Sequence, residues 1–255
     1  MNNLIAVIGD PISNVYLSKN NLEEFSPIGS YPAGALSLYL NAESINKNNS
    51  TNVLWLIPFQ SLNIYESIYI NDSYTETFDC TFQKKYYAKL ASLQLSILKK
   101  ENIQNYNKTA LLISHQNKGF LNSTSNFSVE KKFDYIALTS NLENFNFSFL
   151  QFGLVKIWYT NSNIYYDKYS NLFDIILRNI DDNVLQVIRN NKILFEMSLQ
   201  PCKIVDACGS EESIISAFIS ALMYGLGVRE SLAFSVQAFH DVTQKPKIQI
   251  TKLML

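Results

Sequence analysis

The segment with the clearest chemical potential runs from Ile204 to Leu222. It reads as a short strand, a loop that contains Gly209, two acidic residues, Glu211 and Glu212, and a long apolar helix. A loop that enters a helix in this way directs backbone N–H groups at an anion. An adjacent carboxylate can accept the proton of an acceptor hydroxyl during phosphoryl transfer. The alternative is an ordinary helix start with acidic residues in its first turn, and this segment alone supports both equally.

Strands and helices alternate along the chain, and they would position this loop. Short apolar runs predict buried strands at Leu4–Ile8, Asn52–Ile57, Thr109–Ile113, Tyr135–Leu138, Val155–Tyr159 and Val184–Ile188, the last paired with Lys192–Phe195. Helical spacing predicts a helix just after Pro32, one at Ser213–Tyr224 and one from Val228 to about Val242. A closing strand is expected at Lys247–Thr251. Residues 88–99 fit a strand or a helix.

This alternation predicts an α/β protein, a three-layer sandwich with a mostly parallel sheet. Between Tyr65 and Tyr87 apolar and polar residues alternate with a period of two, which predicts half-exposed strands of a small β lid beside that sheet. No repeat or low-complexity linker interrupts the sequence, so residues 1–255 are expected to form a single domain, with the lid strands within 65–90.

The composition excludes several classes of protein. The 255 residues carry 21 Lys and Arg against 22 Asp and Glu, a formal charge of −1, which argues against a nucleic-acid-binding arm or a polybasic membrane anchor. Three cysteines and two histidines show no spacing of a disulfide framework or a metal site. The N-terminus does not resemble a signal peptide, and no apolar run reaches the roughly 20 residues that span a bilayer. We expect a soluble cytoplasmic protein.

The loop at 206–212 carries a resemblance to a known family. It reads Asp-Ala-Cys-Gly-Ser-Glu-Glu and resembles the Asp-Thr-x-Gly-Ala-Gly-Asp signature of ribokinase-type (PfkB) sugar kinases. Four further segments are similar, in the same order, to the bacterial D-glycero-β-D-manno-heptose-7-phosphate kinase branch of that family: residues 7–16, 32–41, 109–122 and 139–145. They match its Val-Gly-Asp-x-x-x-Asp-x-Tyr, Pro-Gly-Gly-Ala-Ala-Asn, Leu-Ser-Asp-Tyr-Gly-Lys-Gly and Thr-Pro-Asn-x-x-Glu-Phe motifs. Residues 146–183 have no placed counterpart.

The resemblance implies a ribokinase-like fold and an ATP-dependent kinase, assisted by Mg²⁺, that phosphorylates a heptose phosphate or a related sugar. It implies Glu212 as catalytic base, with the N–H groups of Gly209 and Ser210 holding phosphate. The implied sugar contacts are Asp10, Asn14, Gly34, Ser37 and Lys118, and the implied nucleotide contacts are Asn141, Asp206, Gln237 and His240. Relatives of this type often dimerise through the lid, so a homodimer is expected there.

The departures from the family pattern concern the chemistry directly. Ser210 and Glu211 stand where the pattern has Ala-Gly, and Glu212 stands where it has the catalytic Asp. The extra negative charge of Glu211 would repel a phosphate by about 4 kcal/mol at about 4 Å and an effective dielectric of about 20. His115 replaces an Asp, and Gln237 and His240 add bulk beside the expected adenine. Two hypotheses follow: a sugar kinase of weak or lost activity, or a non-catalytic relative that binds a sugar or a partner protein.

Overall fold

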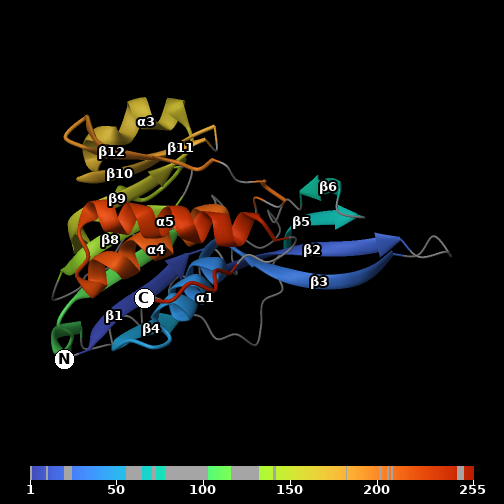
Figure 1. Ribbon diagram of the computed structural model, residues 1–255, viewed down its shortest axis with the longest axis horizontal. Helices are drawn as coiled ribbons and strands as arrows, with labels where there is room; N and C mark the ends of the chain where they lie inside the picture. The colour runs from blue at the N-terminus through green and yellow to red at the C-terminus, as the bar shows by residue number, and fades with distance from the viewer. Residues whose placement is uncertain are drawn as a thin grey trace.

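The computed structural model describes most of the chain (Figure 1). The described residues are 2–9, 11–19, 25–55, 65–70, 73–77, 103–115, 132–139, 142–181, 183–200, 203–205, 207, 209–245 and 250–255. In 11–19, 25–33, 55, 65–70 and 73–77 only the backbone is described.

An eight-stranded sheet forms the body of the molecule, in the order β12-β11-β10-β9-β8-β7-β1-β4. Its strands are β1 (Asn3–Gly9), β4 (Thr51–Trp55), β7 (Thr109–Ser114), β8 (Phe133–Thr139), β9 (Gly153–Thr160), β10 (Ile175–Ile180), β11 (Val184–Arg189) and β12 (Lys192–Ser198). The six strands β10, β9, β8, β7, β1 and β4 are parallel to one another. Strands β11 and β12 are antiparallel additions at one edge. The expected mostly parallel sheet is confirmed.

The central strands are apolar runs because both faces of the sheet are covered. In β1, Leu4, Ala6 and Ile8 pack into the hydrophobic core on one face, and Ile5 and Val7 pack into the core on the other. A parallel sheet buried on both sides has no polar face, so its strands read as continuous hydrophobic segments.

Three helices cover one face of the sheet: α1 (Gly34–Asn46), α4 (Ser210–Tyr224) and α5 (Val228–Thr243) (Figure 1). Helix α4 ends at Gly225, a left-handed residue whose N–H donates to the carbonyls of Ala221 and Leu222. The sequence predicted this stop, because glycine adopts the left-handed conformation at a helix end without steric cost. Helices α4 and α5 have nearly the predicted bounds.

The opposite face is covered by short elements within the described residues. These are η2 (Ile103–Asn105), η3 (Phe147–Phe152), α3 (Asn163–Tyr169) and η4 (Ser170–Leu172). Helix α3 starts at Ser162, whose side chain accepts a hydrogen bond from the N–H of Tyr165. It lays Tyr165, Tyr166 and Tyr169 against the aromatic-rich core on this face. The sequence did not predict α3 or β10.

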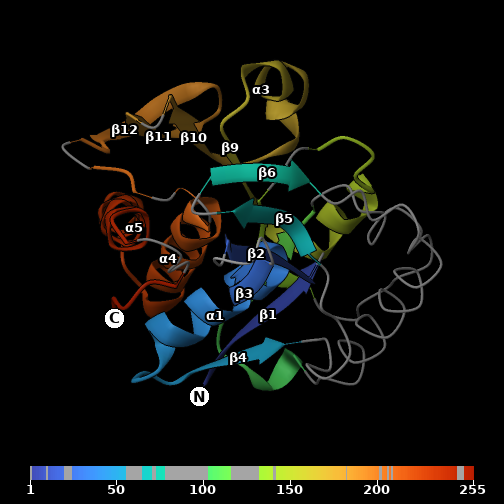
Figure 2. The same cartoon turned by 90° about the vertical axis from the view of Figure 1, so that its right-hand side faces the viewer.

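A second, four-stranded sheet projects from the carboxyl end of the main sheet (Figures 1 and 2). Its order is β3-β2-β5-β6, formed by β2 (Pro11–Lys19), β3 (Phe25–Ala33), β5 (Tyr65–Ile70) and β6 (Ser73–Thr77). Strands β5 and β6 lie where the period-two pattern suggested strands, and residues 78–87 of that pattern lie outside the described residues. The antiparallel pair β2–β3 was not predicted, although it forms half of this lid.

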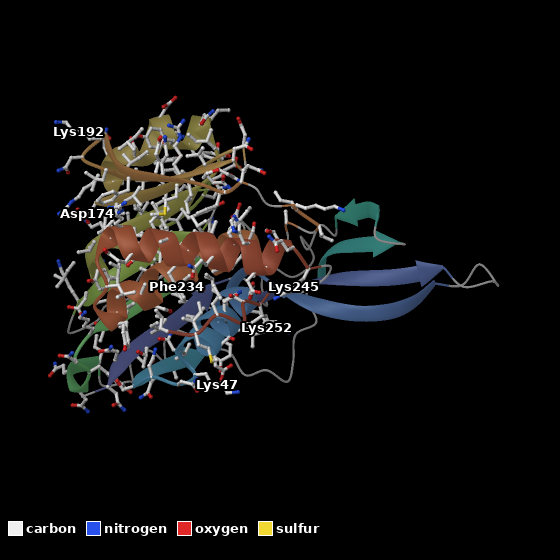
Figure 3. All side chains as sticks on the ribbon, viewed as in Figure 1. Lys47, Asp174, Lys192, Phe234, Lys245 and Lys252 are labelled. Carbon is white, nitrogen blue, oxygen red and sulfur yellow. The ribbon has the colours of Figure 1, made fainter. Side chains whose placement is uncertain are left out.

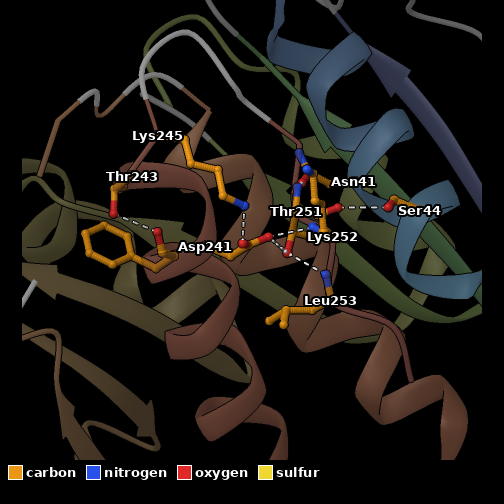
Figure 4. Close-up of polar contacts among 9 residues, drawn as sticks. Asn41, Ser44, Asp241, Thr243, Lys245, Thr251, Lys252 and Leu253 are labelled. Carbon is orange, nitrogen blue, oxygen red and sulfur yellow. Dashed lines mark hydrogen bonds and ion pairs between the residues drawn. The ribbon is translucent and has the colours of Figure 1, made fainter.

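The predicted closing strand at Lys247–Thr251 is wrong where the structure describes it. Ile250 and Thr251 are not in a strand, and residues 246–249 lie outside the described residues. The N–H of Thr251 donates to Asn41 Oδ1, and its carbonyl accepts from the Ser44 hydroxyl (Figure 4). The backbone of Thr251 is therefore bonded to side chains of α1, and an apolar alternation in sequence could not indicate such side-chain partners.

Candidate functional site

The parallel strands end together at one edge of the sheet, which is the edge next to the lid. Gly9 of β1 lies in register with Ser114 of β7, and Ser114 lies in register with Thr139 of β8. Ligands of open α/β sheets bind outside this carboxyl edge. The candidate site is therefore built from the residues that end these strands and from the helix that starts beside them.

Helix α4 starts at this carboxyl edge. Its cap, Gly209, has a φ of 76°, in the left-handed region that glycine adopts readily. Because the cap is glycine, no cap side chain covers the first N–H groups of the helix. Asn161, directly after β9, donates from Nδ2 to Glu211 Oε1 at 3.0 Å and so joins the start of α4 to the end of β9.

Two carboxylates occupy the first turn of α4. Glu211 is half-buried and is held by Asn161, whereas Glu212 is only 5% exposed. The positive end of the helix dipole favours both negative charges. The same charges oppose a second anion at this helix start, which was the expectation from the sequence.

Gly9 allows the ends of β1 and β7 to approach closely. Its φ is 137°, and a Cβ added to it would lie 2.0 Å from the carbonyl oxygen of Ser114. Only glycine fits such an approach. Gly9 precedes Asp10, an expected sugar contact, so it fixes where the chain leaves β1 toward the lid.

His115 follows β7 and is fully buried. Its Nε2 lies 2.8 Å from the carbonyl oxygen of Glu143 and therefore donates to it, and its ring meets Phe145 edge-on at 5.4 Å. Burial lowers the pKa of this imidazole from 6.5, although the carbonyl partner acts in the opposite direction. His115 is thus a neutral group in a place where the resemblance implied a carboxylate.

Three buried polar atoms at the ends of β7 and β8 have no hydrogen-bond partner among the described residues. They are Ser114 Oγ, His115 Nδ1 and Thr139 Oγ1. Buried polar groups are nearly always paired with protein, water or ligand. These atoms make the carboxyl edge chemically distinct from the apolar strand interiors, and the sequence had not singled out Ser114 or Thr139.

The expected sugar contacts are only partly described. Gly34 starts α1 with a φ of 54° and is buried. Ser37 is fully buried, and Asn41 Nδ2 donates to its hydroxyl at 3.1 Å and to its carbonyl at 2.8 Å. The Ser37 hydroxyl is therefore enclosed and already bonded to Asn41 in this structure. Asn14 lies on β2, where only the backbone is described.

The two expected nucleotide contacts on α5 differ in their surroundings. Gln237 is exposed, whereas His240 Nε2 lies 2.9 Å from the carbonyl oxygen of Leu199, to which it donates. His240 therefore attaches α5 to the buried residue that follows β12. Asp10, Lys118, Asn141 and Asp206 lie outside the described residues, so the roles expected for them stay predictions.

Asn161 is the contact in this site that the sequence did not suggest. It lies one residue after β9, at the edge where parallel strands end. A polar residue directly after a predicted strand was the available signal. Asn161 matters because its amide lies close to Glu211 in space, although the two residues are 50 positions apart in the sequence. Only the fold brings them together.

The described residues fit a transferred phosphate and its metal poorly. The uncapped start of α4 suits an anion, but Glu211 places a fixed carboxylate there. Within the part of the chain that the structure describes, no three His, Cys, Asp or Glu side chains are grouped so that they could hold a metal ion. In the same part, no helix is long and apolar enough to cross a membrane.

No model of a known protein family matches the chain, and no curated protein sequence matches it significantly. Solved structures are similar to it in fold. A ribokinase from Thermotoga maritima matches with a TM-score of 0.60 at 11% identity, over 97% of this chain and 94% of that one. A nucleoside kinase from Methanocaldococcus jannaschii, described as an archaeal member of the ribokinase family, gives 0.61 at 10%, over 98% and 95%.

A third neighbour is a fructokinase from Vibrio cholerae O395, solved with fructose, ADP and a calcium ion. It matches with a TM-score of 0.60 at 11% identity, over 99% of this chain and 96% of that one. The eight-stranded, mostly parallel sheet and the helices over it agree with the fold of these neighbours. The chain therefore has the ribokinase-like α/β fold.

Proposed function

We propose that this chain is a sugar kinase homologue that binds a sugar or sugar phosphate at the carboxyl edge, and whose ATP-dependent phosphoryl transfer is weak or lost. One observation carries the proposal. Helix α4 starts at the carboxyl edge on a glycine that provides no side-chain cap, an arrangement that suits an anion, yet its first turn holds Glu211, which Asn161 contacts. The layout favours descent from a kinase, and the charge disfavours a bound phosphate.

In the active form of this proposal the roles follow from the resemblance. Glu212 would take the proton of the acceptor hydroxyl. The N–H groups of Gly209 and Ser210 would face the phosphate, and the Ser210 N–H would first have to leave the Ala207 carbonyl, to which it donates at 3.2 Å. Asp10 and Asn14 would hold the sugar, a heptose phosphate being the first candidate. Glu212 is 5% exposed, so its carboxylate would have to reach the hydroxyl from an enclosed position. ATP and Mg²⁺ belong to this form only.

The second candidate function is a non-catalytic, cytoplasmic relative that binds a sugar, or a partner protein through the lid. The fixed carboxylate of Glu211 favours it, since about 4 kcal/mol of repulsion at about 4 Å and a dielectric of about 20 equals or exceeds what one anion-hole donor supplies. In both candidates the lid remains the proposed surface for a homodimer, because its strands project from the body (Figure 1).

Calorimetry with Mg-ATP separates the two candidates. The kinase candidate predicts saturable binding and slow transfer to a heptose phosphate, measured as ADP release. Absence of binding at millimolar ATP removes that candidate. Titration with sugars and sugar phosphates in the absence of nucleotide then tests the binding function, and a lack of any sugar binding leaves only the partner-protein form.

A loop variant tests whether Glu211 is the defect. We expect Glu211→Gly combined with Glu212→Asp to raise ATP affinity at least tenfold, because 1.4 kcal/mol of removed repulsion already gives that factor. A matched control is Glu230→Gln, which removes a carboxylate from the first turn of α5 instead. If the loop variant binds no better than the control, the adenine side near Gln237 and His240 is the obstacle.

A further inference from the structure

A cavity of about 320 Å³ lies between η4, the start of β10 and the turn that joins β11 to β12. Three apolar side chains form one part of its lining: Phe173, Ile176 and Ile188. Ile176 and Ile188 lie in register on neighbouring strands, and the ring of Phe173 stacks on that of Trp158 with the centroids 5.1 Å apart. All four side chains belong to the packed core, so this apolar wall is held in place.

Four uncharged polar side chains complete the lining: Ser170, Asn171, Asn190 and Asn191. Asn190 and Asn191 form the turn between β11 and β12, with φ angles of 51° and 58°, a left-handed conformation that asparagine tolerates. Asn191 Nδ2 donates to Asn171 Oδ1 at 3.3 Å. This bond connects the turn to η4 and so fixes the two polar segments of the lining relative to each other.

These polar side chains retain most of their hydrogen-bonding capacity. Within the described part of the chain, the Ser170 hydroxyl and the Asn190 amide make no hydrogen bond, and Asn171 Nδ2 and Asn191 Oδ1 also lack a protein partner. Amides and hydroxyls together supply both donors and acceptors. Each hydroxyl group of a ligand can donate one hydrogen bond and accept others, so this lining suits a ligand that carries several hydroxyls.

The lining contains no charged residue. Arg189 and Lys192 flank the turn, but they lie in register on the face of the sheet opposite to that of Ile188, because successive residues of a strand point to opposite faces. The carboxylate of Asp174 accepts a hydrogen bond from the N–H of Lys156 at 2.8 Å, which holds it toward β9. A charged ligand would lose its hydration here without meeting an opposite charge. The cavity therefore favours an uncharged ligand.

Size and chemistry together define the ligand. A volume of about 320 Å³ is near the lower limit of about 300 Å³ at which small-molecule pockets are found. Such pockets combine apolar walls with a few polar groups that fix the orientation of the ligand. We propose that this cavity binds an uncharged polyhydroxy compound of about the size of a monosaccharide. Its C–H groups pack against the apolar wall, and its hydroxyls bond the amides and the Ser170 hydroxyl.

This site is separate from the carboxyl edge. Phe173 precedes β10, which starts at Ile175, so the cavity lies at the opposite, amino edge of the parallel strands. Figure 3 shows Asp174 and Lys192, each next to a lining residue in the sequence, on the side of the molecule away from the lid. The inference therefore does not depend on the proposed function.

NMR titration of the full chain, isotopically labelled at its asparagine side chains, tests the proposal with D-glucose, D-mannose and D-ribose as probes. We expect at least one of these sugars to shift the amide signals of Asn171 and Asn190 saturably. Asn190→Gly keeps the turn, because glycine adopts a φ of 51° readily, and should raise the dissociation constant about fivefold, as for one lost neutral hydrogen bond. Combined with Ser170→Ala, it should raise the dissociation constant about twentyfold.

A matched control is Asn105→Ala, which removes an exposed amide of η2 outside the cavity and should leave the dissociation constant unchanged. Circular dichroism verifies that every variant is folded. The proposal is overturned if no sugar shifts Asn171 and Asn190 at tens of millimolar, or if the combined variant binds as tightly as the wild type. Inorganic phosphate that shifts these signals at lower concentration than the sugars would overturn the uncharged ligand. Shifts confined to Asn161 would place sugar at the carboxyl edge alone, which supports the proposed function and overturns this site.

Discussion

At the scale of single residues, burial without a charged partner determines the protonation state of His115. It is fully buried, its Nε2 donates to a backbone carbonyl, and its pKa is lowered from 6.5, chiefly by desolvation. Burial disfavours the charged form of an imidazole. A neutral histidine at the carboxyl edge supplies neither the negative charge of the carboxylate that the resemblance implied nor a positive charge for a phosphate.

The direction of this shift predicts how stability depends on pH. The unfolded chain binds a proton at His115 near pH 6.5, whereas the folded chain binds it only at lower pH. The contribution of neutral, buried His115 to the free energy of unfolding is therefore fully present above about pH 6.5. It is lost as the pH falls, and the free energy of unfolding changes by at most about 1.4 kcal/mol per pH unit. We expect His115→Gln to flatten the stability curve between about pH 7 and pH 5.

Urea denaturation at several pH values measures that curve, and an NMR titration of the ring protons measures the pKa directly. The signal that disappears in His115→Gln identifies the residue. A midpoint at or above 6.5 would contradict the burial argument, because a base that titrates normally cannot be enclosed in the folded state without a compensating acid.

At the scale of elements, the close contact of β1 and β7 depends on Gly9. Gly9→Ala would combine a φ of 137° with a Cβ 2.0 Å from the Ser114 carbonyl oxygen. Because that oxygen belongs to the backbone, the strands themselves must separate. We expect a loss of about 3 kcal/mol or more in the free energy of unfolding, measured with urea.

Gly225→Ala is the matched control for this prediction. Gly225 also has a positive φ, 104°, but a Cβ there would meet only Lys108 Nζ at 3.9 Å. Its cost is confined to backbone strain, about 1–2 kcal/mol. Similar losses for both variants would show that strain at φ, rather than the approach of the two strands, explains the effect.

The sequence predicted those elements whose signal is local. Apolar runs gave β1, β7, β8, β9 and β11, and glycines after a helical pattern gave the end of α4. It did not predict β2 and β3, which alternate weakly and include Pro11, Pro27 and Pro32. The two strands pair with each other, and β2 also pairs with β5, which begins only at Tyr65, so the sheet that stabilises them is not visible in the local pattern.

The candidate site divides in the same way. Gly209 and Glu211 stand in one segment, and the sequence placed both at a helix start. The link from Asn161 to Glu211 joins two elements, so no single segment indicates it. The burial of Ser37 likewise depends on packing against other elements, since polar spacing along α1 is equally consistent with an exposed serine.

At the scale of the whole molecule, the C-terminal segment ties α1 to α5. Thr251 donates its N–H to Asn41 Oδ1 at 2.7 Å and its hydroxyl to Asp241 Oδ2 at 3.0 Å, and Lys245 Nζ also bonds Asp241 (Figure 4). Burial would raise the pKa of Asp241, but the hydrogen bonds from Lys245, Lys252 and Thr251 outweigh it and lower the pKa from 3.8. This carboxylate therefore stabilises the fold at neutral pH and stops doing so as the pH falls through the acid range.

The bonds from Thr251 to α1 join residues 210 and 207 positions apart, so their loss should weaken the helical layer as a unit rather than one segment. Asn41→Ala removes the acceptor of the buried Thr251 N–H and the amide that donates to the Ser37 hydroxyl. We expect it to lower the free energy of unfolding by about 2–3 kcal/mol, against about 1 kcal/mol for Ser44→Ala, which removes one bond to the Thr251 carbonyl. Hydrogen exchange distinguishes the two scales: loss of protection throughout α1, α4 and α5 supports a shared layer, whereas loss confined to residues 250–255 would show that the segment merely rests on the surface.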